Sequence, residues 1–204
     1  MATIPLFPLG NALFPDGVMH LRVFEIRYLD MIAKCVAEGS SFGIVPLLAG
    51  REVRTPEGKE TLAGAGTLAG IVESVSPMPG LLQVVCAGTS RFRLLSASQG
   101  KFGLWTGEIE LLDDDPVHEI PPPLQRSANA LGAVIADLQR RATPPALMPL
   151  APPFRLDESG WVANRWGEIL PIAMQVKQEL LLVVDPTERL ARVQVLLQER
   201  DLLP

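Results

Sequence analysis

The sequence predicts an α+β fold with a β-rich first half, interrupted by one helix, and a helical second half. Short apolar segments separated by Gly and Pro turns recur through the first half, a pattern typical of a compact barrel or sandwich. A helical apolar stripe interrupts these segments between Glu25 and Glu38. After Pro121–Pro123 the apolar periodicity becomes helical, which predicts a second half built from helices.

The strands expected in the first half are short and are bounded by turn residues. The intervening helix carries Leu29, Ile32 and Val36 on one face, and Gly39 follows as its expected C-cap. The polar stretch 51–60 is expected to be an exposed loop because it contains Pro and Gly. The predicted strands are residues 4–7, 18–23, 42–48, 67–75, 82–86, 91–96 and 104–111.

The second half is expected to contain a series of amphipathic helices. Asp185 is the predicted N-cap of the last one, with Pro186 at the first helical position and Glu188 completing a capping box. A proline-rich linker separates the two halves, so we expect two subdomains, 1–115 and 116–204. The earlier helices are predicted at residues 124–141, 161–170 and 174–184.

Composition and charge narrow the class of protein. Hydrophobic residues make up 48% of the 204 residues, so a large core can form without disulfides. Cys35 and Cys86 are expected to be reduced core thiols, with a disulfide or a reactive thiol as the alternatives. The net charge of −5 argues against general attraction to nucleic acid or membranes. Neither a basic leader nor an apolar run of about 20 residues is visible, so we expect a cytoplasmic protein.

Motifs that would supply catalysis, a cofactor or a metal site are absent from the sequence. The pairs Gly58-Lys59 and Gly100-Lys101 lack the remaining residues of a phosphate-binding loop. No Cys-x-x-Cys, His-Glu-x-x-His or Gly-x-Ser-x-Gly segment occurs. His20 and His118 are expected to be structural or surface residues, and Asp113–Asp115 a solvated turn, with weak divalent-cation binding as the alternative. The sequence therefore predicts no catalytic residue, no cofactor and no metal.

Four sets of segments form an ordered pattern over nearly the whole chain. They are Ile4–Leu9 with Leu13–Pro15, Leu21–Tyr28 with Met31, Gly66–Ala69 with Gly88–Arg93, and Lys177–Leu181 with Asp185-Pro186 and Glu188–Leu190. Each set is weak alone, and the order and spacing of all four make the match specific. Taken together, the chain resembles the Lon protease N-terminal domain family, and the second set is typical of its stand-alone members.

The resemblance implies a fold and a function. The fold would be a PUA-like β-pseudobarrel with one helix, followed by an α-helical bundle, in agreement with the pattern of elements above. The function would be recognition of substrate polypeptides. The ATPase module and the Ser-Lys protease module of the complete protease are missing from the sequence, so we expect no enzymatic activity, and a protease label taken from the family name would mislead.

The residues of the family signature are expected to hold the structure together. Phe24, Glu25, Arg27 and Tyr28 open the first helix, where the carboxylate of Glu25 suits the helix dipole. Arg91 lies on a later strand and is expected to pair with Glu25, fixing the helix against the barrel. The alternative is a recognition groove lined by Arg27, Tyr28 and Arg91.

The turn that joins two predicted strands is the first candidate for polypeptide binding. It exposes Met78, Leu81 and Leu82 on either side of Pro79-Gly80, and Met adapts to varied partners. Trp161 is the second candidate, because it lies five residues from Trp166 and the two cannot share one narrow helical stripe. The alternative for each candidate is core packing.

Three functions remain open at this point. The first is a binding module for unfolded polypeptide segments, or a protein adaptor. The second is RNA binding by analogy with other PUA-like proteins, which would need a cluster of Arg22, Arg27, Arg91 and Arg93 on one face. The third is an enzyme or small-ligand binder without a visible motif, which would need a pocket holding a carboxylate or histidine with a displaced pKa.

Overall fold

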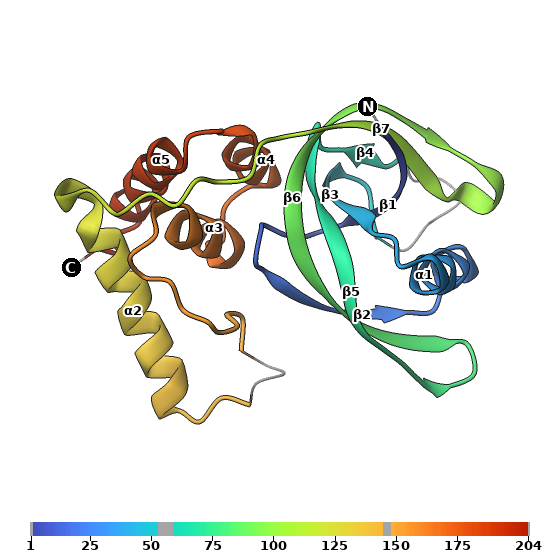
Figure 1. Ribbon diagram of the computed structural model, residues 1–204, viewed down its shortest axis with the longest axis horizontal. Helices are drawn as coiled ribbons and strands as arrows, with labels where there is room; N and C mark the ends of the chain where they lie inside the picture. Colours follow the sequence, from blue (N-terminus) through green and yellow to red (C-terminus); the bar gives the residue numbers. More distant parts are fainter. Residues whose placement is uncertain (1, 53–58, 145–147, 204) are drawn as a thin grey trace.

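The computed structural model describes residues 2–52, 59–144 and 148–203, apart from the side chain of Lys101. The chain forms a β half and a helical half that lie side by side and are joined by residues 112–121 (Figure 1). The predicted α+β class is therefore confirmed. Most of the loop expected at 51–60 falls on residues 53–58, outside the described residues.

The strands of the β half form one sheet that closes on itself. They are β1 (Ala2–Leu9), β2 (Val18–Val23), β3 (Phe42–Ala49), β4 (Thr61–Leu62), β5 (Ala65–Met78), β6 (Leu81–Gln99) and β7 (Trp105–Leu111). The sheet runs β1–β7–β6–β5–β3, and parallel pairing of β3 with β1 closes it. Strand β2 adds to β6, and β4 adds to β3. Helix α1 (Ile26–Glu38) packs Tyr28, Met31 and Ile32 into the core of this barrel.

The predicted cap of the first helix is confirmed, whereas the prediction of two separate strands at 82–86 and 91–96 is wrong. Helix α1 ends at Gly39, whose φ of 62° is the left-handed cap conformation. The predicted strands 82–86 and 91–96 are parts of the single long strand β6. The strand continues through Gly88, which pairs with Ala69 of β5. The N–H of Gly88 also donates to the carbonyl of Gly17 at 2.8 Å. A side chain at Gly88 would place its Cβ 2.2 Å from the carbonyl oxygen of Phe14, so glycine lets the β1–β2 loop cross β6 closely.

The two cysteines are free thiols buried in the core of the β half. Burial raises the pKa of Cys86 to about 12, so its thiol stays protonated at neutral pH. The prediction of reduced core thiols is confirmed.

The helical half packs its helices around a shared core. They are α2 (Gln125–Arg140), α3 (Ser159–Ile169), α4 (Met174–Leu182) and α5 (Pro186–Gln198), with a 3-10 turn at Pro122–Leu124. The predicted start of α5 is confirmed, since Asp185 accepts a hydrogen bond from the N–H of Glu188 at 2.8 Å. No described helix has both the length and the apolar character needed to cross a membrane.

The core of the helical half includes three residues of the β half, Ala12, Phe14 and Ala65. Phe14, on the β1–β2 loop, is fully buried among the helices together with Trp166 and Leu181. Gly167 of α3 makes room for it, because a Cβ there would lie 2.7 Å from the phenyl ring. The two halves therefore share apolar packing as well as the linker.

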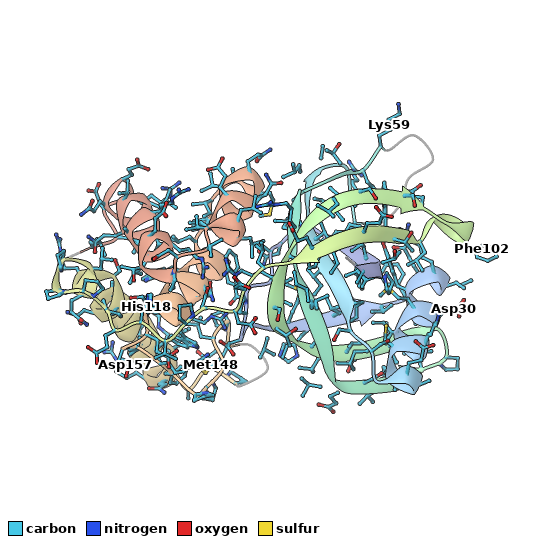
Figure 2. All side chains as sticks on the ribbon, turned by 45° about the horizontal axis from the view of Figure 1, so that its top comes forward. Asp30, Lys59, Phe102, His118, Met148 and Asp157 are labelled. Carbon is cyan, nitrogen blue, oxygen red and sulfur yellow. The ribbon has the colours of Figure 1, made fainter. Side chains whose placement is uncertain are left out.

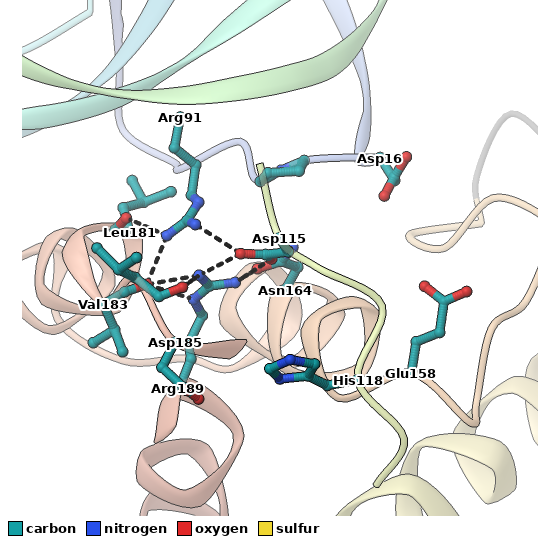
Figure 3. A network of polar contacts seen from close by, with 12 residues as sticks. Asp16, Arg91, Asp115, His118, Glu158, Asn164, Leu181, Val183, Asp185 and Arg189 are labelled. Carbon is teal, nitrogen blue, oxygen red and sulfur yellow. Dashed lines mark hydrogen bonds and ion pairs between the residues drawn. The ribbon is translucent and has the colours of Figure 1, made fainter. Parts of the chain in front are cut away.

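A buried cluster of charges joins the barrel to the helices where the chain leaves β7 (Figure 3). Arg91 on β6 donates to Asp115 at 2.7 Å and to the carbonyl oxygens of Leu181 and Val183 at 2.9 and 2.7 Å. Arg189 on α5 binds both carboxylate oxygens of Asp115, at 2.5 and 2.8 Å. One carboxylate thus connects β6, the linker and α5.

Burial and charge act against each other in this cluster. Burial favours the protonated form of Asp115, but the hydrogen bonds and charge of Arg189, with the charge of Arg91, hold its pKa below the ordinary value. Burial, reinforced by the like charge of Arg189, lowers the pKa of Arg91 to about 10. Two predictions are wrong here: Asp115 is not part of a solvated turn, and Arg91 pairs with Asp115 rather than with Glu25.

A second group of polar contacts fastens the β1–β2 loop to α3. Glu168 accepts a hydrogen bond from the N–H of Phe14 at 2.9 Å and pairs with Arg165 at 3.3 Å. Arg165 donates to the carbonyl of Pro15 at 2.6 Å. Burial raises the pKa of Glu168 to about 7, although Arg165, the Phe14 N–H and Lys177 oppose that change.

Replacing Asp115 by Ala should lower the free energy of unfolding by about 3–5 kcal/mol, because two buried guanidinium groups lose their counter-ion. Urea denaturation checks this value. The matched control is Asp113→Ala, an exposed aspartate two residues away, which should change stability by less than about 0.5 kcal/mol. Equal effects of the two substitutions would contradict the role of the buried cluster.

The raised pKa of Glu168 predicts that stability falls as pH rises from 5 to 8. The unfolded carboxyl ionises near its ordinary value of 4.5, whereas the folded one ionises near 7. The native state therefore binds the extra proton, and its stabilising effect, on the order of 2 kcal/mol, is lost through this range. Urea denaturation at several pH values should show a flatter dependence for Glu168→Gln. The exposed control Glu179→Gln should keep the wild-type slope, and an unchanged slope in Glu168→Gln would refute the assignment.

Candidate functional site

A cleft of about 400 Å³ opens in the side of the barrel between β1 and β2. Its wall combines apolar and aromatic side chains with several polar and charged ones. The lining residues are Phe7, Leu9, Asn11, Met19–Glu25, Tyr28 and Glu52. A largely apolar pocket with a few polar groups is the usual form of a binding site in a protein of unknown function.

The cleft exists because consecutive strands do not pair with each other. In the described parts of the chain, β1 pairs with β7 and β3, whereas β2 pairs with β6 alone. The loop between β1 and β2 runs to the helical half, where Phe14 is buried. The two strands diverge toward that anchor, and the space between them remains open.

The floor of the cleft is held rigidly by the start of α1. Tyr28 stacks on Phe7 with ring centroids 4.0 Å apart, and the Arg27 guanidinium lies 4.5 Å from the centre of the Tyr28 ring. Arg27 also donates to the carbonyl of Gly103 at 2.6 Å and pairs with Glu25 at 2.9 Å. Burial raises the pKa of Tyr28 above its ordinary value, so its hydroxyl stays neutral. Arg27 and Tyr28 thus fix the helix to the barrel.

Exposed apolar side chains surround this floor. Phe24, a family-signature residue expected to be structural, is 56% exposed and lines the cleft. Ile26, at the first turn of α1, is also exposed. Phe102 projects from the turn between β6 and β7, away from the barrel (Figure 2). Its φ of 60° is rare for a bulky residue, and it precedes the Gly103 carbonyl that Arg27 binds.

The hairpin candidates lie on β5 and β6, and β6 pairs with β2, the strand that lines the cleft. Met78 is 58% exposed, and Leu81, its cross-strand partner, is half-buried. Leu82 is half-buried as well, packs against the barrel core and pairs with Val23 of β2. The hairpin tip and the cleft are therefore connected through the register between β2 and β6.

Trp161 does not join this surface. It is 3% exposed in the core of the helical half, with Phe154 edge-on at 6.2 Å and Arg165 over its ring at 5.8 Å. The expectation that Trp161 offers a binding surface is wrong, because the shared core of the helices buries it. Trp166 is buried too.

The recognition groove of Arg27, Tyr28 and Arg91, the alternative to a structural role, is not formed. Tyr28 lines the cleft and Arg27 is buried against its ring, whereas Arg91 is buried in the charge cluster between the two halves. The basic face required for RNA binding is not formed either, since Arg27 and Arg91 are both buried. Leu21 and Val23 line the cleft but were not predicted as binding residues. Their alternation predicts a strand, and it does not indicate that one edge of that strand is open.

The two histidines lie in different places, and His20 shares a cavity with Glu168, a carboxylate whose pKa burial raises. His20 is exposed on β2, and His118 lies 3.5 Å from the hydroxyl of Thr187. Glu168 lines a separate cavity with His20, but hydrogen bonding to Phe14 and pairing with Arg165 already engage its carboxylate. Within residues 2–52, 59–144 and 148–203, no group of His, Cys, Asp or Glu side chains could hold a metal ion.

Comparison with known proteins agrees with this architecture. The sequence profile of the ATP-dependent protease La (LON) substrate-binding domain matches residues 3–199. The structure is similar to that of a Lon N-terminal domain protein from Xanthomonas campestris, with a TM-score of 0.74, 29% identity and coverage of 96% of this chain and 98% of that one. It also resembles the N-terminal domain of a Lon protease from the Mycobacterium avium complex, with a TM-score of 0.57, 18% identity and coverage of 94% and 96%; at that identity the likeness concerns the fold alone. No curated protein sequence shows a significant match.

Substitutions at the floor and at the rim of the cleft should differ in their effect on the free energy of unfolding. Tyr28→Ala should lower the free energy of unfolding by about 3–5 kcal/mol, since a buried aromatic ring is removed from its stack on Phe7. Phe24→Ser should change stability by less than about 0.5 kcal/mol, because the side chain is mostly in solvent. Thermal and urea denaturation measure both. A large loss of stability in Phe24→Ser would mean that this residue belongs to the core.

Proposed function

Because the chain belongs to the family of the ATP-dependent protease La (LON) substrate-binding domain, we propose that it is a non-catalytic module that binds unfolded polypeptide segments, by itself or as an adaptor. The family is that of a substrate-recognition domain, and its profile extends over nearly all of the chain. The observation that carries the proposal is the cleft between β1 and β2, whose apolar lining side chains include the exposed Phe24.

The chemistry of the cleft supports an unfolded client. Folded proteins bury most of their large apolar side chains, whereas unfolded chains expose them. The apolar part of the lining can accept such side chains, and the cavity volume of about 400 Å³ is within the usual range for a binding pocket. The structure holds the cleft open with the Tyr28–Phe7 stack, so a client meets a site that is already formed.

The hairpin tip extends this surface. Met78 has a flexible thioether side chain that can adapt to different sequences, as a module with many clients requires. Leu81 and Leu82 lie beside it on β6, and Leu82 connects the tip to β2. We therefore retain these three residues as a low-specificity contact and place the principal site at the cleft.

Fluorescence anisotropy with reduced, carboxymethylated ribonuclease tests the proposal, with native ribonuclease as the comparison. Binding of the unfolded form is expected with a Kd of about 10–100 µM, or roughly −7 to −5.5 kcal/mol. Phe24→Ser and Met78→Ser should each weaken it by about threefold to tenfold, the loss expected when one apolar contact is removed. Val195→Ser, on the exposed face of α5 and similarly exposed to Phe24, should leave it unchanged.

Two results would count against the module. Absence of binding up to several hundred micromolar, a range above the expected Kd, would remove unfolded segments as clients. Equal binding of native and carboxymethylated ribonuclease would mean that the surface attracts proteins without regard to their folding.

A further inference from the structure

Strand β2 has one edge without a partner strand. All six of its residues are in register with β6, from Val18 opposite Ala87 to Val23 opposite Leu82. Across the ranges that the structure describes, no strand pairs with its other edge. The thiol of Cys86 contacts the carbonyl of Met19 at 3.5 Å, but that cysteine itself belongs to β6. The outward backbone N–H and C=O groups of β2 are therefore available for a further strand.

The open edge borders the cleft. Side chains alternate along β2, so Leu21 and Val23 point to the buried side while His20 and Arg22 are exposed. Both buried side chains line the cleft, and His20 and Arg22 line it from the exposed side of the strand. A strand placed on the open edge would continue this alternation, with every second side chain on the buried side with Leu21 and Val23 and the others beside His20 and Arg22.

We propose that an unfolded polypeptide binds by adding an extended segment to the open edge of β2, with alternating apolar and acidic side chains. This inference rests on the proposed function and specifies the form of its ligand. The segment's backbone bonds to the outward groups of β2, and its apolar side chains enter the cleft. The alternate side chains lie beside His20 and Arg22.

The arrangement of hydrogen-bonding groups favours this occupant over other ligands. Donors and acceptors that recur along a strand match another extended backbone, whereas a helix has already used its own groups internally. Backbone pairing is also independent of sequence, as the recognition of many unfolded chains requires. The side chains then supply a preference without dictating one sequence.

The charge of Arg22, unpaired among the described residues, is the basis of the proposed acidic preference. Glu25 is paired with Arg27, and Glu52 accepts a hydrogen bond from the N–H of Gly10 at 2.6 Å. Arg22 is exposed and makes no ion pair with any described residue. A carboxylate on the added strand would meet this guanidinium at the cross-strand position.

Hydrogen exchange on the intact protein tests the location. Carboxymethylated ribonuclease is added in excess, and exchange is measured by NMR at individual amides. The outward-facing amides between 18 and 23 should exchange at least tenfold more slowly, while those of α2 and α5 stay unchanged. Protection confined to the hairpin 75–82 would overturn the β2 site and leave the proposed function standing. Absence of ribonuclease binding would overturn both.

Labelled octapeptides test the mode of binding. An alternating Leu–Glu peptide is compared with two versions that carry N-methyl groups on alternate amides, one set for each edge of the peptide. One version should bind at least tenfold more weakly and the other within about twofold of the parent, because only one peptide edge faces β2. Equal effects of the two versions, or absence of binding by the parent, would refute strand addition.

The charge preference has its own control. An alternating Leu–Lys peptide should bind at least threefold more weakly than Leu–Glu, and Arg22→Gln should remove that difference. Equal binding of the two peptides to the wild-type protein would overturn the acidic preference. Val195→Ser serves as the matched variant in which the difference should persist.

Discussion

The structure depends on one carboxylate held between two buried arginines. Asp115, on the linker, is largely removed from solvent, which costs desolvation free energy. Close hydrogen bonds from Arg91 and Arg189 offset that cost. The carbonyl oxygens of Leu181 and Val183 complete the environment of the two cations. An arrangement with so many simultaneous requirements is satisfied in one relative position of the barrel and the helices. It therefore defines how the two halves sit against each other.

That fixed position leads to the opening in the barrel. The β1–β2 loop is held at α3 by Glu168 and Arg165 and is anchored by Phe14 in the helical core. In the described residues β1 and β2 do not pair, and the chain between them is anchored in the helical half. The cleft and the open edge of β2 thus follow from the contact between the halves, even though their lining comes entirely from the β half.

Much of the fold could be predicted from local patterns. The alternation at 18–23 gave β2 its bounds, and the Asp185-Pro186 signal gave the start of α5. The partners of charged residues could not be predicted in this way. Arg91 finds Asp115 and Arg189 across long sequence separations, and the cleft depends on which strands fail to pair. The burial of Trp161 likewise depends on the packing of several helices around it, which helical periodicity alone does not determine.

Phe14 also limits how this architecture can be recombined. Its ring occupies the helical core at Gly167, and its backbone lies on Gly88 of β6. A β half transplanted onto a different set of helices would bring an aromatic side chain without a cavity to receive it. The helices transferred alone would keep a hole the size of that ring. The two halves therefore have to be exchanged together. A chimaera of two homologues would need the β1–β2 loop and helix α3 from the same parent.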